Sequence, residues 1–182
     1  MNALLEDLLT LARLESRQEK LVRVPLELPA LLRSVAEDWS QKLAAKNLKL
    51  TVEAPANLPR VTGDTLRLEQ VLHNLFENAV KFTESGGNIS LRAHVVAGEV
   101  EVRVEDTGQG IPPADLPHIF ERFYRADKAR SREQGGTGLG LSIVKHIIQL
   151  HGGSVTADSK YGKGTTIILR LPIEPAGAEP QG

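Results

Sequence analysis

The sequence contains no cysteine, which excludes disulfide bonds, thiol catalysis and cysteine-ligated metal sites. Its formal net charge is only -1, so charge gives no reason to expect binding to nucleic acid or to an anionic membrane. No run approaches the ~18 apolar residues of a membrane span, and the N-terminus lacks the basic start, apolar run and cleavage site of a signal peptide. These absences predict that this stretch of chain is cytoplasmic and has no direct membrane contact, while a longer protein that contains it could still be anchored in a membrane.

The hydrophobic periodicity predicts one main domain that contains both helices and strands. A chain of 182 residues, 41% of them hydrophobic, is long enough to bury one ordinary core. Helices are expected over residues 29–46, 65–82 and 139–151, and strands over 21–24, 48–53, 88–97, 99–106, 154–159 and 165–171. This order predicts an α+β fold, a two-layer sandwich whose mixed, mainly antiparallel sheet is covered on one face by three helices.

Four segments are expected along the chain: an N-terminal helix over 1–16, a charged linker over 17–20, the main domain over 21–172 and a flexible tail over 173–182. The first helix is amphipathic and begins without a capping residue, as if it continued a longer element; an ordinary surface helix of the main domain is the alternative. Residues 111–137 are charged and contain prolines, which is typical of a functional lid or a disordered segment.

The helix over 65–82 carries polar side chains along one edge. Asn74, Asn78 and Lys81 follow at i, i+4 and i+7, beside the apolar stripe that faces the core. Two asparagines in a helix interior reduce helix stability, so the pattern suggests that they serve a function. Mg²⁺ takes few protein oxygens and completes its octahedron with water and phosphate oxygens. We therefore predict Asn78 as a metal ligand, Asn74 as its support and Lys81 as a phosphate contact; a merely solvated face is the alternative.

Two glycine-containing motifs complete a candidate nucleotide site. Asp106 ends a predicted strand and opens D-T-G-Q-G, where Gly108 and Gly110 let the backbone approach a flat ring such as adenine, although a simple turn has the same pattern. The segment G-G-T-G-L-G-L over 135–141 enters a helix, where backbone N–H groups can bind phosphate. It matches neither the Walker A spacing nor the dinucleotide fingerprint.

Taken together, these motifs resemble the catalytic ATP-binding domain of sensor histidine kinases, which belongs to the GHKL superfamily. The resemblance covers about residues 21–172. The matching motifs are N-L-F-E-N-A-V-K-F over 74–82 (the N box), D-T-G-Q-G over 106–110, F-E-R-F-Y-R over 120–125 (the F box), G-G-T-G-L-G-L over 135–141 and G-K-G-T over 162–165. It implies the GHKL (Bergerat) type of sandwich, with ATP and Mg²⁺ bound between the Asn-bearing helix, the sheet and the lid.

The resemblance also implies a role for each motif residue. Asn78 would hold Mg²⁺ with support from Asn74, Lys81 and Arg125 would contact phosphates, and Phe82 would stack near the base. Asp106 would bind the adenine amine. The remaining residues expected around ATP are Gly108, Gly110 and Thr165 near the base, and Gly136, Thr137, Gly138, Leu139 and Gly140 near the phosphates. The lid cations Lys128, Arg130 and Arg132 are interpreted as a solvated charge cluster, and a contribution to phosphate binding is the alternative.

Histidine kinases transfer phosphate to a histidine on a separate dimerisation domain, and this chain departs from that complete pattern. None of its five histidines is followed by Glu or Asp, as the acceptor histidine usually is in the family. The N-terminal sequence over 1–16 resembles the end of the second helix of the dimerisation domain. We therefore expect a fragment that binds ATP but lacks the phosphoacceptor, whose partners are the acceptor domain and a response regulator.

Two other functions are compatible with the motifs. A GHKL-type ATP hydrolase would use a glutamate at the position of Asn74 as general base, and an amide cannot act as one at neutral pH. Glu77 lies one turn away, so a catalytic role for Glu77 stays possible. The second alternative is a non-catalytic, nucleotide-binding regulatory module.

Overall fold

The computed structural model describes residues 3–15, 20–126 and 136–173. Its helices are α1 (Ala3–Glu15), α2 (Leu28–Ala45), α3 (Thr65–Phe82) and α5 (Gly140–Leu150), with a short 3-10 helix at Leu116–His118. Its strands are β1 (Val24–Leu26), β2 (Lys49–Glu53), β3 (Val61–Gly63), β4 (Asn88–Val96), β5 (Glu99–Asp106), β6 (Ser154–Lys160) and β7 (Gly164–Pro172).

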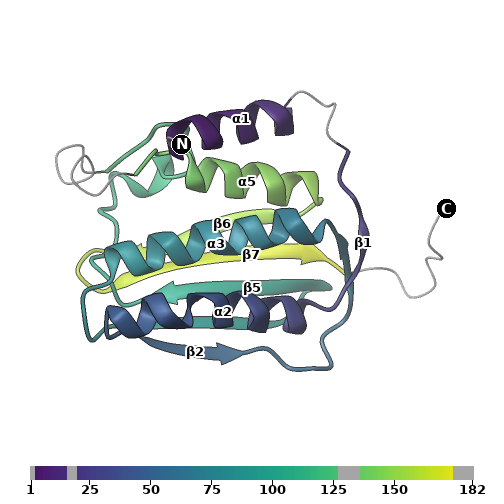
Figure 1. Ribbon diagram of the computed structural model, residues 1–182, viewed down its shortest axis with the longest axis horizontal. Coiled ribbons are helices and arrows are strands. Elements are labelled where there is room, and N and C mark those ends of the chain that lie inside the picture. Colours follow the sequence, from purple (N-terminus) through teal and green to yellow (C-terminus); the bar gives the residue numbers. More distant parts are fainter. Residues whose placement is uncertain (1–2, 16–19, 127–135, 174–182) are drawn as a thin grey trace.

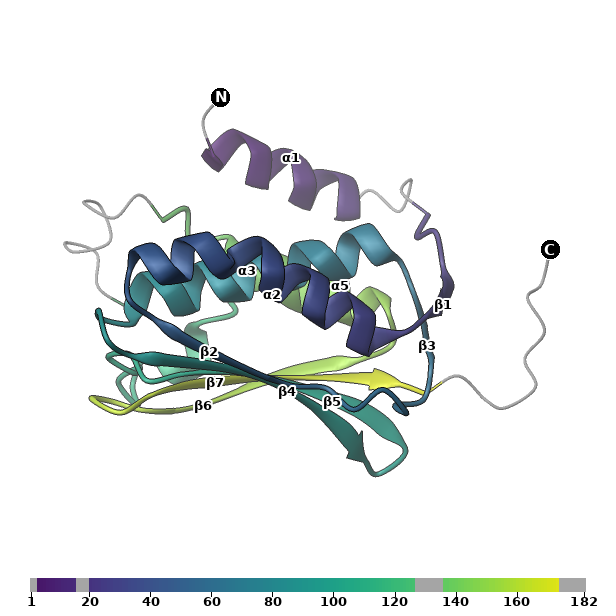
Figure 2. The same ribbon diagram turned by 60° about the horizontal axis from the view of Figure 1, so that its bottom comes forward.

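Five strands form one mixed sheet in the order β2-β4-β5-β7-β6. Strand β2 runs parallel to β4, whereas β4, β5, β7 and β6 pair with their neighbours in antiparallel fashion. Helices α2, α3 and α5 cover one face of this sheet, and α1 lies alongside α5 on the side away from the sheet (Figures 1 and 2). The predicted α+β sandwich with a mainly antiparallel sheet is therefore confirmed.

The core lies between the sheet and the three covering helices. The apolar stripe of α3 packs inward and is buried along its whole length, as the spacing predicts; it consists of Leu68, Val71, Leu72, Leu75, Phe76 and Ala79. The Phe76 ring stacks on Trp39 of α2, with ring centroids 5.9 Å apart. Because the apolar face of α3 is buried in this core, the orientation of its polar edge is fixed. The C-terminal end of α3 lies beside the turn that follows β5, since the Gln109 backbone N–H donates to the Phe82 carbonyl oxygen at 3.2 Å.

The helix boundaries follow local signals that the sequence contains. Asp64 caps α3, since its Oδ1 accepts a hydrogen bond from the Arg67 backbone N–H at 3.1 Å. Pro29 lies in the first turn of α2, where its missing N–H has no cost. Helix α5 covers 140–150, one residue shorter at each end than expected.

The structure differs from the sequence analysis in the small sheet that β1 and β3 form. Strand β1 begins at Val24 instead of Leu21, and β3 was not predicted. Three residues are too few to show the alternation of apolar and polar side chains that marks a strand. Segments β1 and β3 are strands because they pair with each other. Beyond β7, Ile173 still forms a bridge to Val61.

Candidate functional site

The polar edge of α3 faces the start of α5. Asn74 is half-buried, and its Nδ2 donates to the carbonyl oxygen of Gly140 at 3.4 Å. Asn78, one turn further along, is also half-buried, and its side chain makes no hydrogen bond within the part of the chain that the structure describes. The Asn78 amide oxygen is therefore available as a ligand, whereas Asn74 is held against the glycine loop.

Two cationic side chains meet at the glycine loop. A Cβ added to Gly136 would lie 2.6 Å from Lys81 Nζ and 3.7 Å from Arg125 Nη2, so both groups border this backbone. The pKa of Lys81 is lowered by burial and by the neighbouring Arg125 charge, while Glu77 acts in the opposite direction. An anion placed between Lys81 and Arg125 would relieve their repulsion. The structure thus brings together Lys81 of α3, Arg125 of the F-box segment and the glycine loop.

The glycine loop enters α5 without a capping side chain. The residue at the N-cap position is Leu139, and its own N–H is bound by Thr137 Oγ1 at 3.2 Å. Gly138 has a φ of 74°, and a Cβ there would lie 3.0 Å from the backbone of Phe123. The first-turn N–H groups of α5 have no partner within the helix, so this terminus is suited to an anion.

The opposite end of the site is built around Asp106 at the end of β5. Its Oδ1 accepts a hydrogen bond from the Gly108 backbone N–H at 2.8 Å, and the Thr165 backbone also donates to this carboxylate. Burial raises the pKa of Asp106 to about 6, although both backbone hydrogen bonds oppose the rise. At neutral pH the group is thus mainly a half-buried carboxylate, which is a strong acceptor for an amine.

Tight backbone contacts hold the Asp106 end together. Gly110 has a φ of 68°, and a Cβ there would overlap the carbonyl oxygen of Lys160. At Gly164 a Cβ would overlap the carbonyl oxygen of Asp106 itself. The adjacent Thr165 pairs with Asp106 across the β5–β7 ladder. The D-T-G-Q-G and G-K-G-T motifs, which lie far apart in sequence, are therefore packed against each other.

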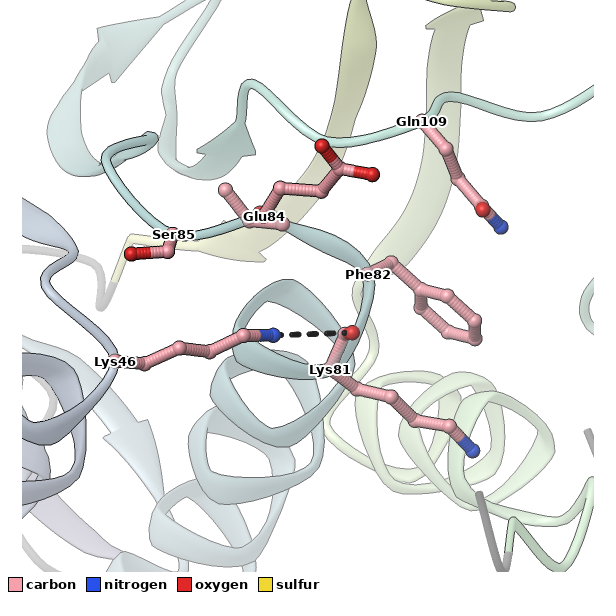
Figure 3. Close-up of a pocket in the computed structure, with 7 residues that line it drawn as sticks. Lys46, Lys81, Phe82, Glu84, Ser85 and Gln109 are labelled. Carbon is pink, nitrogen blue, oxygen red and sulfur yellow. Dashed lines mark hydrogen bonds between the residues drawn. The ribbon is translucent and has the colours of Figure 1, made fainter. Parts of the chain in front are cut away.

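A pocket of about 280 Å³ opens at the C-terminal end of α3 (Figure 3). It is lined by Lys46, Lys81, Phe82, Thr83, Glu84, Ser85 and Gln109. Lys46 Nζ donates to the carbonyl oxygens of Val80 and Lys81, at 2.5 and 3.3 Å, and so caps this helix end. Phe82 lies next to Lys81, whose Nζ is 5.3 Å from the centre of the ring. The pocket connects the lysine at the glycine loop with Gln109 of the D-T-G-Q-G motif.

Sequence reasoning did not single out Lys46, Thr83 or Gln109. Lys46 follows the end of α2, 35 residues before Lys81, and no local sequence pattern indicates that these two residues lie close together. Gln109 lies inside the recognised D-T-G-Q-G motif, in which only Asp106 and the two glycines were assigned a role. Glu77 is exposed on α3 and acts on Lys81 through its charge. The lid cations Lys128, Arg130 and Arg132 lie outside the described residues.

The residues present fit a Mg²⁺ ion that arrives with its nucleotide. Among the described residues, no group of three His, Cys, Asp or Glu side chains is arranged to hold a metal ion. A cation bound here would take most of its ligands from phosphate oxygens and water, as Mg²⁺ commonly does. The uncommitted amide oxygen of Asn78 is a suitable protein ligand for such an ion.

Comparison with known families matches residues 63–175 to the family described as histidine kinase-, DNA gyrase B-, and HSP90-like ATPase. The match covers more than half of the chain, and the chain belongs to this family. Within the described residues, no helix combines the length and apolarity that crossing a lipid bilayer requires.

Similar known proteins narrow the class to sensor histidine kinases. The adaptive-response sensory kinase SasA of Synechococcus sp. (strain JA-2-3B'a(2-13)) is 36% identical over 174 residues, which cover 95% of this chain and 46% of SasA. The sensor histidine kinase WalK of Bacillus subtilis (strain 168) is 37% identical over 176 residues, which cover 96% of this chain and 29% of WalK. The chain therefore spans less than half the length of these two relatives.

Solved structures agree with this class. Full-length ShkA in complex with AMPPNP superposes with a TM-score of 0.82 at 35% identity, over 97% of this chain and 36% of ShkA. The nucleotide-free catalytic domain of histidine kinase ThkA gives a TM-score of 0.72 at 30% identity, over 85% of this chain and 97% of that domain. The chain is thus an ATP-binding catalytic domain of the sensor histidine kinase type, as the motifs predicted.

Proposed function

We propose that this domain binds ATP with Mg²⁺ along the polar edge of α3 and transfers the γ-phosphate to a histidine on a dimerisation domain, for relay to a response regulator. One observation carries the proposal: cationic groups meet at the glycine loop, at Lys81 and Arg125, while a half-buried carboxylate, Asp106, lies beyond the end of α3. A nucleotide has its charge at one end and its amine at the other, so this polarity matches ATP. The similarity to ShkA, solved with AMPPNP, supports the same ligand.

Each side chain has a defined task in this proposal. The Asn78 amide oxygen ligates Mg²⁺, and Asn74 positions the glycine loop through Gly140. Lys81 and Arg125 neutralise phosphate charge, while N–H groups at the start of α5 bind phosphate oxygens. Asp106 accepts a hydrogen bond from the adenine amine. When bound, Mg²⁺ supplies further charge neutralisation, and transfer of the phosphoryl group then depends mainly on in-line positioning.

The acceptor histidine is proposed to lie on another domain because every histidine of this chain has a local structural partner. The contacts pair His73 with Trp39, His94 with Glu101, His118 with Glu121, His146 with the Leu14 carbonyl and His151 with the Ile147 carbonyl. None of these five contacts involves Lys81 or Arg125. The dimerisation domain is therefore the proposed phosphate acceptor.

Hydrolysis of ATP by water is the competing activity, and Glu77 is the residue that would support it. Glu77 is exposed on α3, one turn before Lys81, and could act as a general base towards water. Replacement by Glu77→Gln tests this role, because phosphate release would fall at least tenfold if Glu77 activated water. Unchanged release would exclude it.

Calorimetry on the folded chain tests nucleotide binding. We expect Mg²⁺-dependent uptake of ATP, and Lys81→Ala should weaken it at least tenfold, because a charge-assisted contact to phosphate is lost. Lys49→Ala is the matched control, since it removes an exposed lysine on β2 and should leave affinity unchanged. A folded wild-type chain that takes up no adenine nucleotide in the presence of Mg²⁺ would contradict the proposed function.

Phosphoryl transfer is tested separately, with ATP labelled in its γ-phosphate. The chain alone should acquire no acid-labile label, whereas a dimerisation domain of the same kinase, added in trans, should become labelled on histidine. Stable, acid-labile label on this chain itself would show that one of its five histidines is an acceptor.

A further inference from the structure

Helix α1 reaches the glycine loop through one polar contact. Thr137 Oγ1 donates a hydrogen bond to Asp7 Oδ2 at 2.6 Å, between residues 130 positions apart in the sequence. Thr137 follows Gly136, which borders Lys81, and precedes Gly138, where an added Cβ would lie 3.3 Å from Arg125 Cγ. Asp7 therefore places a carboxylate at the cationic end of the site.

The packing of α1 holds Asp7 in this position. Leu11 and Leu14 are only 5% and 4% exposed, because α1 lies along α5 (Figures 1 and 2). The Leu14 carbonyl oxygen also lies 3.2 Å from His146 Nε2 of α5. Leu11 and Leu14 lie one and two helical turns from Asp7. Their contact with α5 thus holds the Asp7 carboxylate at the glycine loop.

Two physical effects would let the Asp7 carboxylate weaken the binding of a triphosphate. The Thr137 hydroxyl has a single proton, which in this structure is donated to Asp7 and so is not available to a phosphate oxygen. In addition, phosphates bound at the glycine loop would carry charge of the same sign as the Asp7 carboxylate, and like charges repel. Both effects weaken nucleotide binding while α1 is docked.

We propose that Asp7 is a positioning residue through which α1 opposes nucleotide binding, so that docking of α1 on α5 and loading of the triphosphate are antagonistic. The inference rests on the proposed function, because it requires the 136–140 loop to bind phosphates. Coupling between two sites is reciprocal. Bound nucleotide therefore weakens the docking of α1 by the same factor by which docked α1 weakens nucleotide binding.

Calorimetry with Mg²⁺-ATP and Mg²⁺-ADP on charge variants tests the coupling. Asp7→Asn can still accept the Thr137 hydrogen bond but removes the charge, and we expect ATP to bind about fivefold more tightly. Asp7→Ala also frees the hydroxyl and should give at least the same gain. The gain should be larger for ATP than for ADP, which carries one negative charge fewer, and should shrink in high salt. A purely structural role of Asp7 would produce neither difference.

Glu6→Gln is the matched control, because it removes the same charge from an exposed neighbouring position on α1. It should change ATP affinity by less than half of the Asp7→Asn effect. Equal effects of the two variants would mean that general charge, and not the contact with Thr137, is responsible. Unchanged or weakened ATP binding in both Asp7 variants would overturn the inference.

Hydrogen exchange of the α1 amides gives an independent measure. Saturating Mg²⁺-ATP should speed exchange over residues 8–14 of the wild-type chain, and Asp7→Ala should reduce this difference. Nucleotide binding with no change in α1 exchange would overturn the antagonism and leave the proposed function intact. A wild-type chain that binds no nucleotide would instead contradict the proposed function itself, so the two failures are distinguishable.

Discussion

Asp106 Oδ1 accepts a hydrogen bond from the Gly108 backbone N–H at 2.8 Å, inside a turn that folds back against the end of α3. The next N–H in that turn, from Gln109, donates to the Phe82 carbonyl oxygen at 3.2 Å. These two bonds tie the proposed adenine-binding carboxylate to the helix that bears the proposed metal ligand. The two ends of the site are therefore positioned by one short stretch of backbone.

The raised pKa of Asp106 predicts opposite effects of Asp106→Asn on stability and on binding. At pH 7.5 the half-buried carboxylate is ionised, and a neutral amide of the same shape avoids the cost of desolvating that charge. We expect Asp106→Asn to raise the unfolding free energy of the nucleotide-free chain by about 1 kcal/mol and to weaken ATP binding at least tenfold. Urea denaturation and calorimetry measure the two effects.

The pH dependence of the free chain provides the control for Asp106. Because its pKa is about 6 in the folded state and below that in the unfolded state, the wild-type chain loses stability as pH rises through this interval. Adenine binding, which needs the ionised form, should instead weaken as pH falls below about 6. The pH dependence of stability and that of ATP binding should both be smaller in Asp106→Asn. If either were unchanged, a group other than Asp106 would be responsible for it.

Asn78→Ala should abolish the Mg²⁺-dependent part of nucleotide binding with little effect on stability. Asn78 makes no side-chain hydrogen bond within the described residues, so its loss should change the melting temperature by no more than about 2 °C. Calorimetry with ATP in Mg²⁺ and in EDTA measures the metal-dependent part. If the variant bound ATP equally well and equally Mg²⁺-dependently, Asn78 would not be the metal ligand.

Two glycines where β6 passes into β7 differ in their surroundings: Gly162 lies in the turn and Gly164 is the first residue of β7. At Gly164, with a φ of 129°, a Cβ would overlap the Asp106 carbonyl oxygen, so Gly164→Ala should cost about 3 kcal/mol or more. At Gly162, with a φ of 78°, a Cβ would meet no atom within 4 Å, and Gly162→Ala should cost only about 1 kcal/mol. Urea denaturation compares the two; equal costs would contradict the close approach at Gly164.

His151 should make the folded chain less stable in mild acid. It is buried, its Nε2 accepts the Asp64 backbone N–H at 2.9 Å, and burial is the main cause that lowers its pKa below the usual value. The unfolded chain binds a proton on this ring below about pH 6.5 that the folded chain disfavours. The contribution of neutral His151 to the unfolding free energy should therefore be present above this pH and be lost as the pH falls below it.

The His151 effect is best measured in the Asp106→Asn background, where the opposing contribution of Asp106 is absent. Urea denaturation at pH 7.5 and 5.5 should show a lower unfolding free energy at the acidic pH, and the difference should shrink when His151→Gln is added. An equal difference with and without His151 would refute the assignment.

Much of the fold follows from local sequence signals. The apolar stripe of α3, its Asp64 cap and the alternation along β5 identify these elements because side-chain period and capping chemistry are local properties. The same holds for the polar edge formed by Asn74, Asn78 and Lys81. Strand β3, in contrast, exists only through its pairing with β1. Its three residues contain no pattern that distinguishes them from a loop.

The sequence alone determined the class of the protein, through the resemblance of its motifs to those of sensor histidine kinases, and the order of its longer elements, because side-chain periodicity is a local property. Tertiary structure decided which distant groups meet: Arg125 with Lys81 at Gly136, Lys46 with the end of α3, and Asp7 with Thr137. Such contacts arise only when packed helices and strands bring remote parts of the chain together. The charge environment of the site, including the raised pKa of Asp106, follows from that packing and has no counterpart in the linear sequence.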